Sequence, residues 1–451
     1  MSKQVDMSAH FTGKQLLAFC APSILMMILT SIYTVVDGFF VSNFAGKTAF
    51  AAVNFIMPII MLLSSVGFMV GTGGSAIISA TRGAGKPKLA NEYFSLLVYA
   101  TIVTGILMTV IGIVTARPLC ALMGATEQLL DDCVLYGSLV YLSLTGFVLQ
   151  CAFQSFLVAA GKPKVGLYVI IAASLTNIVL DFVLVGFMGM GLVGAALATN
   201  CSEYVGGLAP LIYFARKNGS FFKLGKAPFR GKVLLRTAIN GSSEMANNVS
   251  ASVVNMAYNI VLLNILGENG VAAYGVIMYV FLIFAAVFTG YNMGFSPLLS
   301  FQYGAKNKTE MGHLTRTSLK ITALFSIAML ALAQVLAYPL ALMFCSYDAE
   351  LCALTEHAFR LFYIGILMFG FNIFGSAFFT ALENGKISAL LSFARTLVLE
   401  TGFVFLLPAL FGVEGIWFAF LAAESVAVIA TFAFIVGLEP RYGYGKLLPR
   451  K

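Results

Sequence analysis

Long apolar segments recur along the whole chain and limit the folds it can adopt. Sixty per cent of the 451 residues are hydrophobic and 10% are charged, whereas soluble domains are about 45–50% apolar and about 25% charged. A water-soluble core could not bury this much apolar surface, and the segments are long enough for helices rather than barrel strands. We therefore expect an all-α integral membrane protein with twelve transmembrane helices, near residues 16–42, 52–80, 93–115, 134–158, 165–185, 191–214, 237–265, 272–300, 316–338, 354–381, 387–409 and 413–437.

The second half of the chain repeats the first half at one constant offset. Glycines, a proline and an acid within the spans keep this register, as in the pairs Gly73 and Gly294, Pro118 and Pro339, and Glu203 and Glu424. Six spans return the chain to the side where it started, so two pseudo-symmetric six-helix bundles should share one orientation in the membrane. We expect an N-terminal bundle (1–214), a cytoplasmic linker (215–236), a C-terminal bundle (237–437) and a cytoplasmic tail (438–451).

The net charge of +8 is explained by topology rather than by nucleic acid. If the N-terminus is cytoplasmic, most Lys and Arg residues fall in cytoplasmic loops, with Lys47 and Arg117 outside and Arg360 and Arg395 inside spans. This distribution follows the positive-inside rule. It predicts a multi-pass protein of the inner or plasma membrane with both termini in the cytoplasm, and contact of the basic linker with anionic lipid is a secondary possibility.

Cysteine, histidine and glycine patterns give no sign of a metal centre or an enzyme. Cys120, Cys133, Cys345 and Cys352 fall in or beside outer loops, where they could pair or stay free. Three histidines are few and dispersed, and no Cys/His spacing indicates a metal site. Because the glycine-rich stretches lack the context of a phosphate loop and no catalytic motif is present, we expect no cofactor and no enzymatic activity.

Two acids distinguish the N-terminal half from its repeat. Asp37 lies in the first span, where a carboxylate costs about 2.5–3.5 kcal/mol on insertion scales, and Asp181 lies in the fifth. Their repeat partners are Tyr258 and Gly402. An acid in this setting usually serves an ion, a proton or a substrate, although pairing with a neighbouring helix is the structural alternative.

The fifth span carries a polar stripe. Ser174, Asn177 and Asp181 follow helical spacing and share one face. If Asp37 and Asp181 share a dry pocket, both cannot ionise easily, so one should hold a proton. This is the chemistry that a proton-coupled carrier needs. The alternative is that the stripe joins helices through hydrogen bonds.

Further acids lie in the spans. Glu203 and Glu424 are repeat-related, so a structural role in both bundles is expected. Arg395 could neutralise Glu424 or Glu400. Glu244 lies in a polar stretch at the start of the seventh span, where it could line the cytoplasmic mouth of a cavity or bind a cation.

With these features the chain resembles the multidrug and toxic compound extrusion (MATE) family, and most closely its prokaryotic DinF-like and MepA-like branches. The resemblance covers essentially the whole length. It includes the paired Gly-x-x-Gly-Ala-Ala (191–196) and Gly-x-x-Gly-Ile-Trp (412–417) entries to the sixth and twelfth spans. It also includes a bending proline followed by an acid in the first span (Pro22, Asp37) and Asn-x-x-x-Asp in the fifth (Asn177, Asp181).

The resemblance implies a V-shaped pair of bundles that work by alternating access. It assigns cation coupling to the N-terminal bundle, where Na⁺ could also bind at Asp37, Asn177, Asp181 and Thr199. Tyr33, Tyr136 and Gln154 complete this set, with Gln154 where the family usually has Asn. A C-terminal sodium site usually has an acid in the tenth span. Here Asn372 stands at that position, so protons at the N-terminal site are favoured, with Glu244 and Asn372 as a substrate-cavity or secondary cation site.

We therefore expect a secondary active multidrug antiporter that exports organic cations or drugs in exchange for H⁺ or Na⁺. The alternative is a flippase for lipid-linked precursors or polysaccharides in the same superfamily. It would require basic residues in the cavity, and only Arg360 and Arg395 lie within spans. An adaptable apolar lining from 40 Phe and 19 Met suits poorly selective drug binding. We expect a monomer in membrane lipid, because the two repeats already provide the interface.

Overall fold

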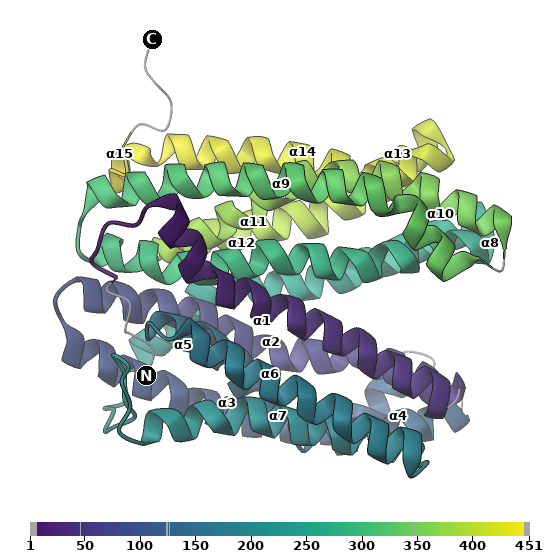
Figure 1. The fold of residues 1–451 in the computed structure, drawn as a ribbon, viewed down its shortest axis with the longest axis horizontal. Coiled ribbons are helices and arrows are strands. Elements are labelled where there is room, and N and C mark those ends of the chain that lie inside the picture. Colours follow the sequence, from purple (N-terminus) through teal and green to yellow (C-terminus); the bar gives the residue numbers. More distant parts are fainter. Residues whose placement is uncertain (1–6, 46, 123–124, 126, 347, 446–451) are drawn as a thin grey trace.

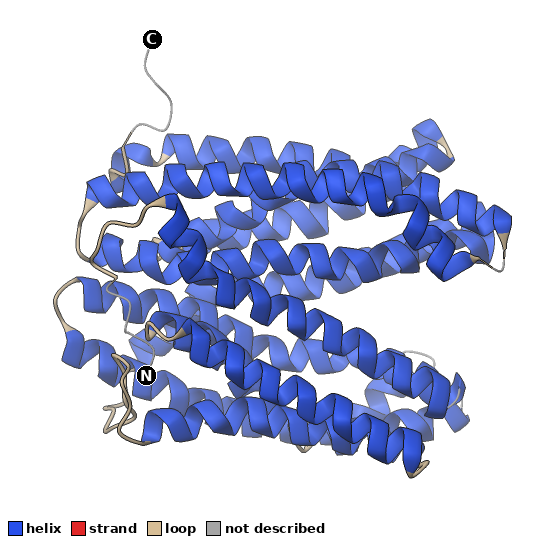
Figure 2. Ribbon diagram, in the orientation of Figure 1, coloured by secondary structure: helices blue, strands red, loops and turns tan. Residues whose placement is uncertain are grey.

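The computed structural model describes residues 7–45, 47–122, 125, 127–346 and 348–445, and no strand occurs among them (Figure 2). The N-terminal half contains α1 (Gly13–Phe40), α2 (Lys47–Gly83), α3 (Pro87–Leu122), α4 (Glu127–Tyr141), α5 (Leu144–Ala159), α6 (Pro163–Leu180) and α7 (Gly191–Ala215). The C-terminal half contains α8 (Gly231–Gly304), α9 (Lys308–Cys345), α10 (Ala349–Phe362), α11 (Ile366–Ala381), α12 (Gly385–Phe393), α13 (Thr401–Phe411), α14 (Val413–Gly437) and α15 (Glu439–Tyr442).

The helices form two bundles that lie one above the other in Figure 1. Short turns join pairs of helices into single spans: α4 with α5, α10 with α11 through a 3₁₀ turn (Tyr363–Gly365), and α12 with α13 through a π-helical turn (Ala394–Glu400). The first of these pairs is bent by 56° between Tyr141 and Leu144. The fourth span is therefore not the straight helix over 134–158 that the apolar pattern predicted.

The helix α8 holds two spans. The sequence predicted separate helices over 237–265 and 272–300, and α8 runs through both of them with a kink at Gly267, whose backbone torsions are not helical (φ 64°, ψ −151°). Gly412 has a similar conformation (φ 63°, ψ −142°) between α13 and α14. Positive φ is readily adopted by glycine and rarely by other residues. A single glycine with positive φ therefore lies at each of these two turns. With α8 counted as two, each joined pair as one and the short α15 left out, the described residues form the twelve long helices of the predicted fold.

Contacts between the two halves repeat with pseudo-twofold symmetry. A Cβ added at Gly83, the last residue of α2, would overlap the carbonyl of Phe301, and one added at Gly304, the last residue of α8, would overlap the carbonyl of Ala80. The same relation links Gly73 with Gly241, and Gly294 with Cys20. Small residues let helix backbones approach closely in membranes. We call this set of contacts the glycine seam.

Both described ends of the chain and the linker lie at one end of the molecule, on the left of Figure 1; we call it the terminal end. The linker runs from 216 to 230, since α7 ends at Ala215 and α8 begins at Gly231. It is fixed to α3, where Asn91 accepts a hydrogen bond from Lys223 N at 2.8 Å and Glu92 pairs with Arg230 at 3.0 Å. Residues 446–451 of the predicted tail lie outside the described residues.

The seven cysteines are all free thiols in the structure. Cys133 Sγ donates to the Ala52 carbonyl oxygen at 3.7 Å, and Cys345 Sγ lies 3.6 Å from Thr355 Oγ1. Of the two possibilities left open by the sequence, the structure therefore has the free thiols.

Candidate functional site

Asp37 is buried near the carboxyl end of α1. Its side chain is 6% exposed, and α1 passes into a π-helical turn (Val41–Ala45) just beyond it. Short π-helical turns are uncommon and occur often at functional sites. The helix itself continues through Pro22. Because proline has no N–H to donate within the helix, one α1 hydrogen bond is missing at the predicted bend.

The predicted polar stripe on the fifth span faces Asp37. Asn177 and Asp181 are 1% and 0% exposed, and Asp181 begins a second π-helical turn (Asp181–Phe187) after α6. The side chains of both residues interact with the Asp37 carboxyl. The two acids are thus brought together from α1 and α6, as the sequence predicted if they shared one pocket.

Other predicted site residues lie around Asp37 and Asp181, together with Glu203, for which the sequence predicted a structural role. Tyr136 of α4 is fully buried, interacts with Thr199 of α7 and lies in the electrostatic field of Asp37. Tyr33, one turn before Asp37, lies in the field of Glu203 and of Asp37. Glu203 was expected to be structural, but it lies in the field of Asp37 as well. We call Asp37, Asn177, Asp181, Thr199 and Glu203, with Tyr33 and Tyr136, the N-terminal acid cluster.

The contacts of Glu203 indicate its protonation state. Ser143 Oγ lies 2.6 Å from Glu203 Oε2 and 2.6 Å from Asn200 Oδ1. The Asn200 amide nitrogen donates to the Leu139 carbonyl at 2.9 Å, so its oxygen is the atom that faces Ser143. Ser143 Oγ also lies 3.0 Å from the Val140 carbonyl oxygen, and one hydroxyl proton cannot serve three acceptors. Both of the 2.6 Å contacts are hydrogen bonds if Glu203 carries a proton and donates it to Ser143, which then donates its own to Asn200.

The acids of the N-terminal acid cluster differ from most buried acids in their lack of a basic partner among the described residues. Among the described residues, no Lys, Arg or His forms an ion pair with Asp37, Asp181 or Glu203. One oxygen of Asp37 and both oxygens of Asp181 are buried without a well-formed hydrogen bond, as is the hydroxyl of Tyr136. A buried carboxylate is costly unless it is paired, binds a cation or takes a proton. In this cluster, bound protons or a bound cation would offset that cost.

Gln154 is buried on α5 and lines a small pocket with Gln150, Gly206 and Pro210. Its coupling role stays a prediction.

The buried acids of the C-terminal bundle, unlike those of the N-terminal acid cluster, lie near an arginine. Arg395 Nη1 lies 3.4 Å from Glu424 Oε1, and Arg395 Nη2 donates to Asn247 Oδ1 at 2.9 Å, which confirms one of the two predicted partners of this arginine. Glu400 and Glu244 also lie in the field of Arg395. One arginine thus compensates a group of acids in this bundle.

Asn372 and Glu244, the predicted secondary site, both adjoin this arginine network. The Asn372 amide nitrogen donates to Glu424 Oε2 at 2.6 Å, and its oxygen accepts from Thr431 Oγ1 at 2.9 Å. Glu244 is half-buried on α8. Because Asn372 already uses both ends of its amide within the protein, it has little capacity left for a ligand.

We expect Arg395→Ala to lower the free energy of unfolding by about 3–5 kcal/mol, because removing one partner of a buried pair leaves uncompensated charge. Arg360→Ala is the matched control. Arg360 pairs with Glu356 at 2.8 Å but is 42% exposed, and such surface pairs contribute about 0–1 kcal/mol. Thermal unfolding in detergent measures both. Equal loss of stability in the two variants would contradict the structural role of Arg395.

The expectation that the three histidines are too dispersed to form a cluster is wrong for two of them. His10, Glu310 and His313 offer ligand atoms that all lie within 4.8 Å of one another. The spacing of His10 and His313 along the chain hides this proximity, which arises because the residues before α1 pack against the start of α9.

Comparison with known proteins places this geometry in a family. The MatE family profile matches residues 22–183 and 245–406, one segment in each bundle. "Multidrug export protein MepA" of Staphylococcus haemolyticus is 24% identical over 432 residues, which are 95% of this chain and 94% of that protein. The MepA protein of Staphylococcus saprophyticus is 22% identical and is covered to 96%, with 97% of this chain matched.

Solved structures share the fold. A crystal structure of a MATE protein in complex with MaL6 superimposes with a TM-score of 0.92 at 21% identity, over 99% of this chain and all of that one. The chain therefore belongs to the MatE family, the multidrug and toxic compound extrusion family that its motifs resemble.

Proposed function

We propose that this protein is a secondary active exporter of organic cations and drugs, which exchanges its cargo for protons bound at the N-terminal acid cluster. Membership of the family and the similarity to proteins named for multidrug export support the export of drugs. Na⁺ is the alternative coupling ion, with Asp37, Asn177, Asp181 and Thr199 as its ligands.

The observation that carries the proposal is the group of uncompensated acids. Asp37, Asp181 and Glu203 are buried together without a basic partner among the described residues. A cationic drug nearby favours their charged forms, and its departure favours proton uptake. A cationic drug and protons compete for the same carboxylates. This competition is enough to couple the export of the drug to the entry of protons. The arginine-compensated acids of the C-terminal bundle lack this property.

Topology and assembly complete the proposal. The terminal end carries the basic linker and both described ends of the chain, so it faces the cytoplasm by the positive-inside rule. The glycine seam closes the molecule between α2 and α8 toward this end. The protein then functions as a monomer in the inner or plasma membrane, in a conformation closed to the cytoplasm. No cofactor takes part beyond the coupling ion.

Purified protein in lipid vesicles tests the function. A fluorescent organic cation such as ethidium is followed while a pH gradient or a Na⁺ gradient is imposed separately. We expect movement of the dye driven by the pH gradient. Dye movement driven only by the Na⁺ gradient would leave the N-terminal acid cluster as the coupling site, with Na⁺ instead of H⁺ as the coupling ion. If neither gradient moves the dye, drug export is wrong and flipping of lipid-linked precursors becomes the function to test.

A further inference from the structure

The segment before α1 is docked on the C-terminal bundle. Met7 and Phe11 are 1% and 4% exposed, and the Gln302 amide donates to the Met7 carbonyl oxygen at 2.9 Å. Both side chains pack in one apolar cluster with Met311 and Leu314 of α9. Residues 7–12, the N-terminal segment, therefore have a defined position, although they precede the first span.

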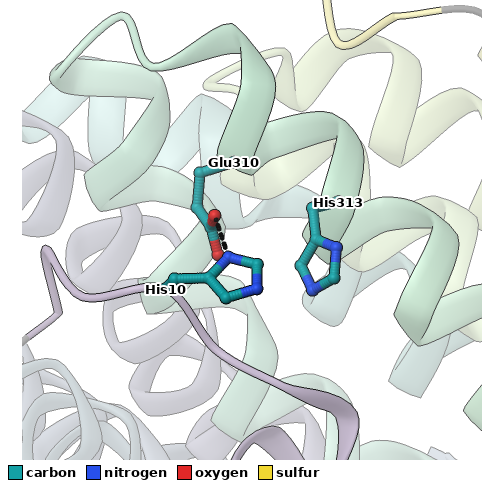
Figure 3. A group of neighbouring side chains, drawn as sticks. All are labelled: His10, Glu310 and His313. Carbon is teal, nitrogen blue, oxygen red and sulfur yellow. Dashed lines mark hydrogen bonds and ion pairs between the residues drawn. The ribbon is translucent and has the colours of Figure 1, made fainter.

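Three side chains with metal-binding capacity meet where this segment crosses α9. Figure 3 shows His10 from the N-terminal segment pointing toward Glu310 and His313, which lie on neighbouring turns of α9. His10 Nδ1 is 2.8 Å from Glu310 Oε2. The rings of His10 and His313 are 4.3 Å apart between centroids, with their planes at 44°. Two imidazoles and one carboxylate therefore face one small volume.

The backbone of Phe11 supports both ligands on α9. Its N–H donates to Glu310 Oε1 at 3.2 Å, and its carbonyl oxygen accepts from His313 Nε2 at 2.9 Å. Because a carbonyl can only accept, Nε2 of His313 carries the proton in this arrangement. Nδ1 of His313 points away from His10 and Glu310 in Figure 3, so His313 can bind an ion here only when its ring turns or when Nε2 gives up this hydrogen bond.

The surroundings also suit a cation. The Glu310 side chain is only 9% exposed, and its ion-pair partner among the described residues is His10 rather than a lysine or arginine. A neutral imidazole can leave this carboxylate charged and ready to bind a metal. Met7, Phe11 and Met311, which neighbour these residues in the sequence, are buried in one apolar cluster, whereas the His10 side chain is 60% exposed. An ion can therefore enter from solvent and keep a water ligand.

We propose that His10, Glu310 and His313 form a binding site for a divalent transition-metal ion of the zinc class. Two His and one Glu leave a fourth position for water, which is a common Zn²⁺ donor set, and imidazole nitrogen also suits Cu²⁺ and Ni²⁺. With Zn–N and Zn–O near 2.0–2.2 Å, tetrahedral donors lie about 3.3 Å apart. The ligand atoms therefore have to move closer together than they are in this structure. Rotation of the partly exposed His10 side chain would supply most of this movement, and the hydrogen bond between His10 and Glu310 would be lost.

The bound ion would fasten the N-terminal segment to α9. Thr12, the N-cap of α1, comes directly after this segment, and the far end of α1 carries Asp37. In Figure 1, α1 starts beside α9 and crosses toward α6. An ion bound at the start of α1 therefore restrains the helix that links the C-terminal bundle to the N-terminal acid cluster. It stabilises the proposed conformation that is closed to the cytoplasm.

Metal binding to the full chain tests this site without any measurement of transport. The purification tag is removed, the protein is stripped with a chelator in detergent, and Zn²⁺ is added during thermal unfolding and calorimetry. We expect Zn²⁺ to raise the unfolding temperature of the wild type. His10→Ala and His313→Ala should each weaken binding by about tenfold or more, since each removes a ligand. Co²⁺ should give the visible absorption of a four-coordinate site, lost in both variants.

The third histidine provides the matched control. His357 pairs with Glu414 at 2.7 Å and is 54% exposed, so His357→Ala should keep full Zn²⁺ affinity. His10→Ala alters a half-exposed side chain outside the helices, so the comparison does not depend on a variant with a damaged core. Equal binding in wild type and His10→Ala, or no stabilisation of the wild type by micromolar Zn²⁺, would overturn the proposal.

Discussion

Asp37→Asn and Asp181→Asn should each abolish gradient-driven export while the protein stays folded. Each variant keeps the size of the side chain but removes a group that can exchange a proton for a cation. One proton that moves down a pH difference of one unit supplies about 1.4 kcal/mol, or roughly a tenfold accumulation of cargo. Either variant should lose accumulation of this order in vesicles with an imposed pH gradient, measured by dye fluorescence.

Asp131→Asn is the matched control for these substitutions. Asp131 makes a 3.6 Å ion pair with Arg117, and its side chain is 73% exposed, so this variant should transport like the wild type. Neither Asp37→Asn nor Asp181→Asn should lower the unfolding temperature, because each removes a buried acid that has no basic partner in the described part of the chain. Full gradient-driven export by either variant would exclude that acid from the coupling mechanism.

Gly83→Ala and Gly304→Ala should destabilise the protein and impair transport by separating the two bundles at the glycine seam. In each case the new Cβ would overlap a backbone carbonyl of the opposite half, that of Phe301 or Ala80. Backbone cannot rotate away as a side chain can, so we expect a loss of about 1–3 kcal/mol, the usual range for overpacking. Thermal unfolding in detergent and dye transport measure the two effects.

Gly275→Ala separates the seam from the general effect of adding a methyl group to a helix. Gly275 also lies in α8, but a Cβ built there meets no other atom within 4 Å. Alanine is the better helix former by roughly 0.8–1.0 kcal/mol, so this variant should be slightly more stable than the wild type. If the seam variants were stabilised as well, close packing between the bundles would not hold this conformation.

Much of the architecture follows from the sequence because periodic signals carry it. Apolar runs locate the spans, and glycines such as Gly73 and Gly294, which keep a constant offset, predict two similar bundles. The same offset marks Asp37 and Asp181 as departures from symmetry. Helical spacing within the fifth span then places Asn177 beside Asp181. Their meeting with Asp37 depends on how the first and fifth spans pack together, which helical spacing does not report.

The features that the sequence did not predict depend on contacts between distant segments or on single backbone torsions. Gly267 joins two spans within α8 because one residue adopts positive φ, which hydropathy does not report. The repeat relation of Glu203 and Glu424 suggested equal roles, but only Glu424 has an arginine within reach, because Arg395 has no counterpart in the first half. His10 and His313 meet through the docking of the N-terminal segment, which no local pattern predicts.

Proton release on cargo binding tests the central claim most directly. Purified protein in weakly buffered detergent solution is mixed with ethidium, and a pH indicator records the protons set free. If the N-terminal acid cluster exchanges protons for a cation, the wild type should release protons as the dye binds, and the Asp37→Asn, Asp181→Asn double variant should release almost none. Dye binding without proton release in the wild type, or equal release from the double variant, would contradict the account.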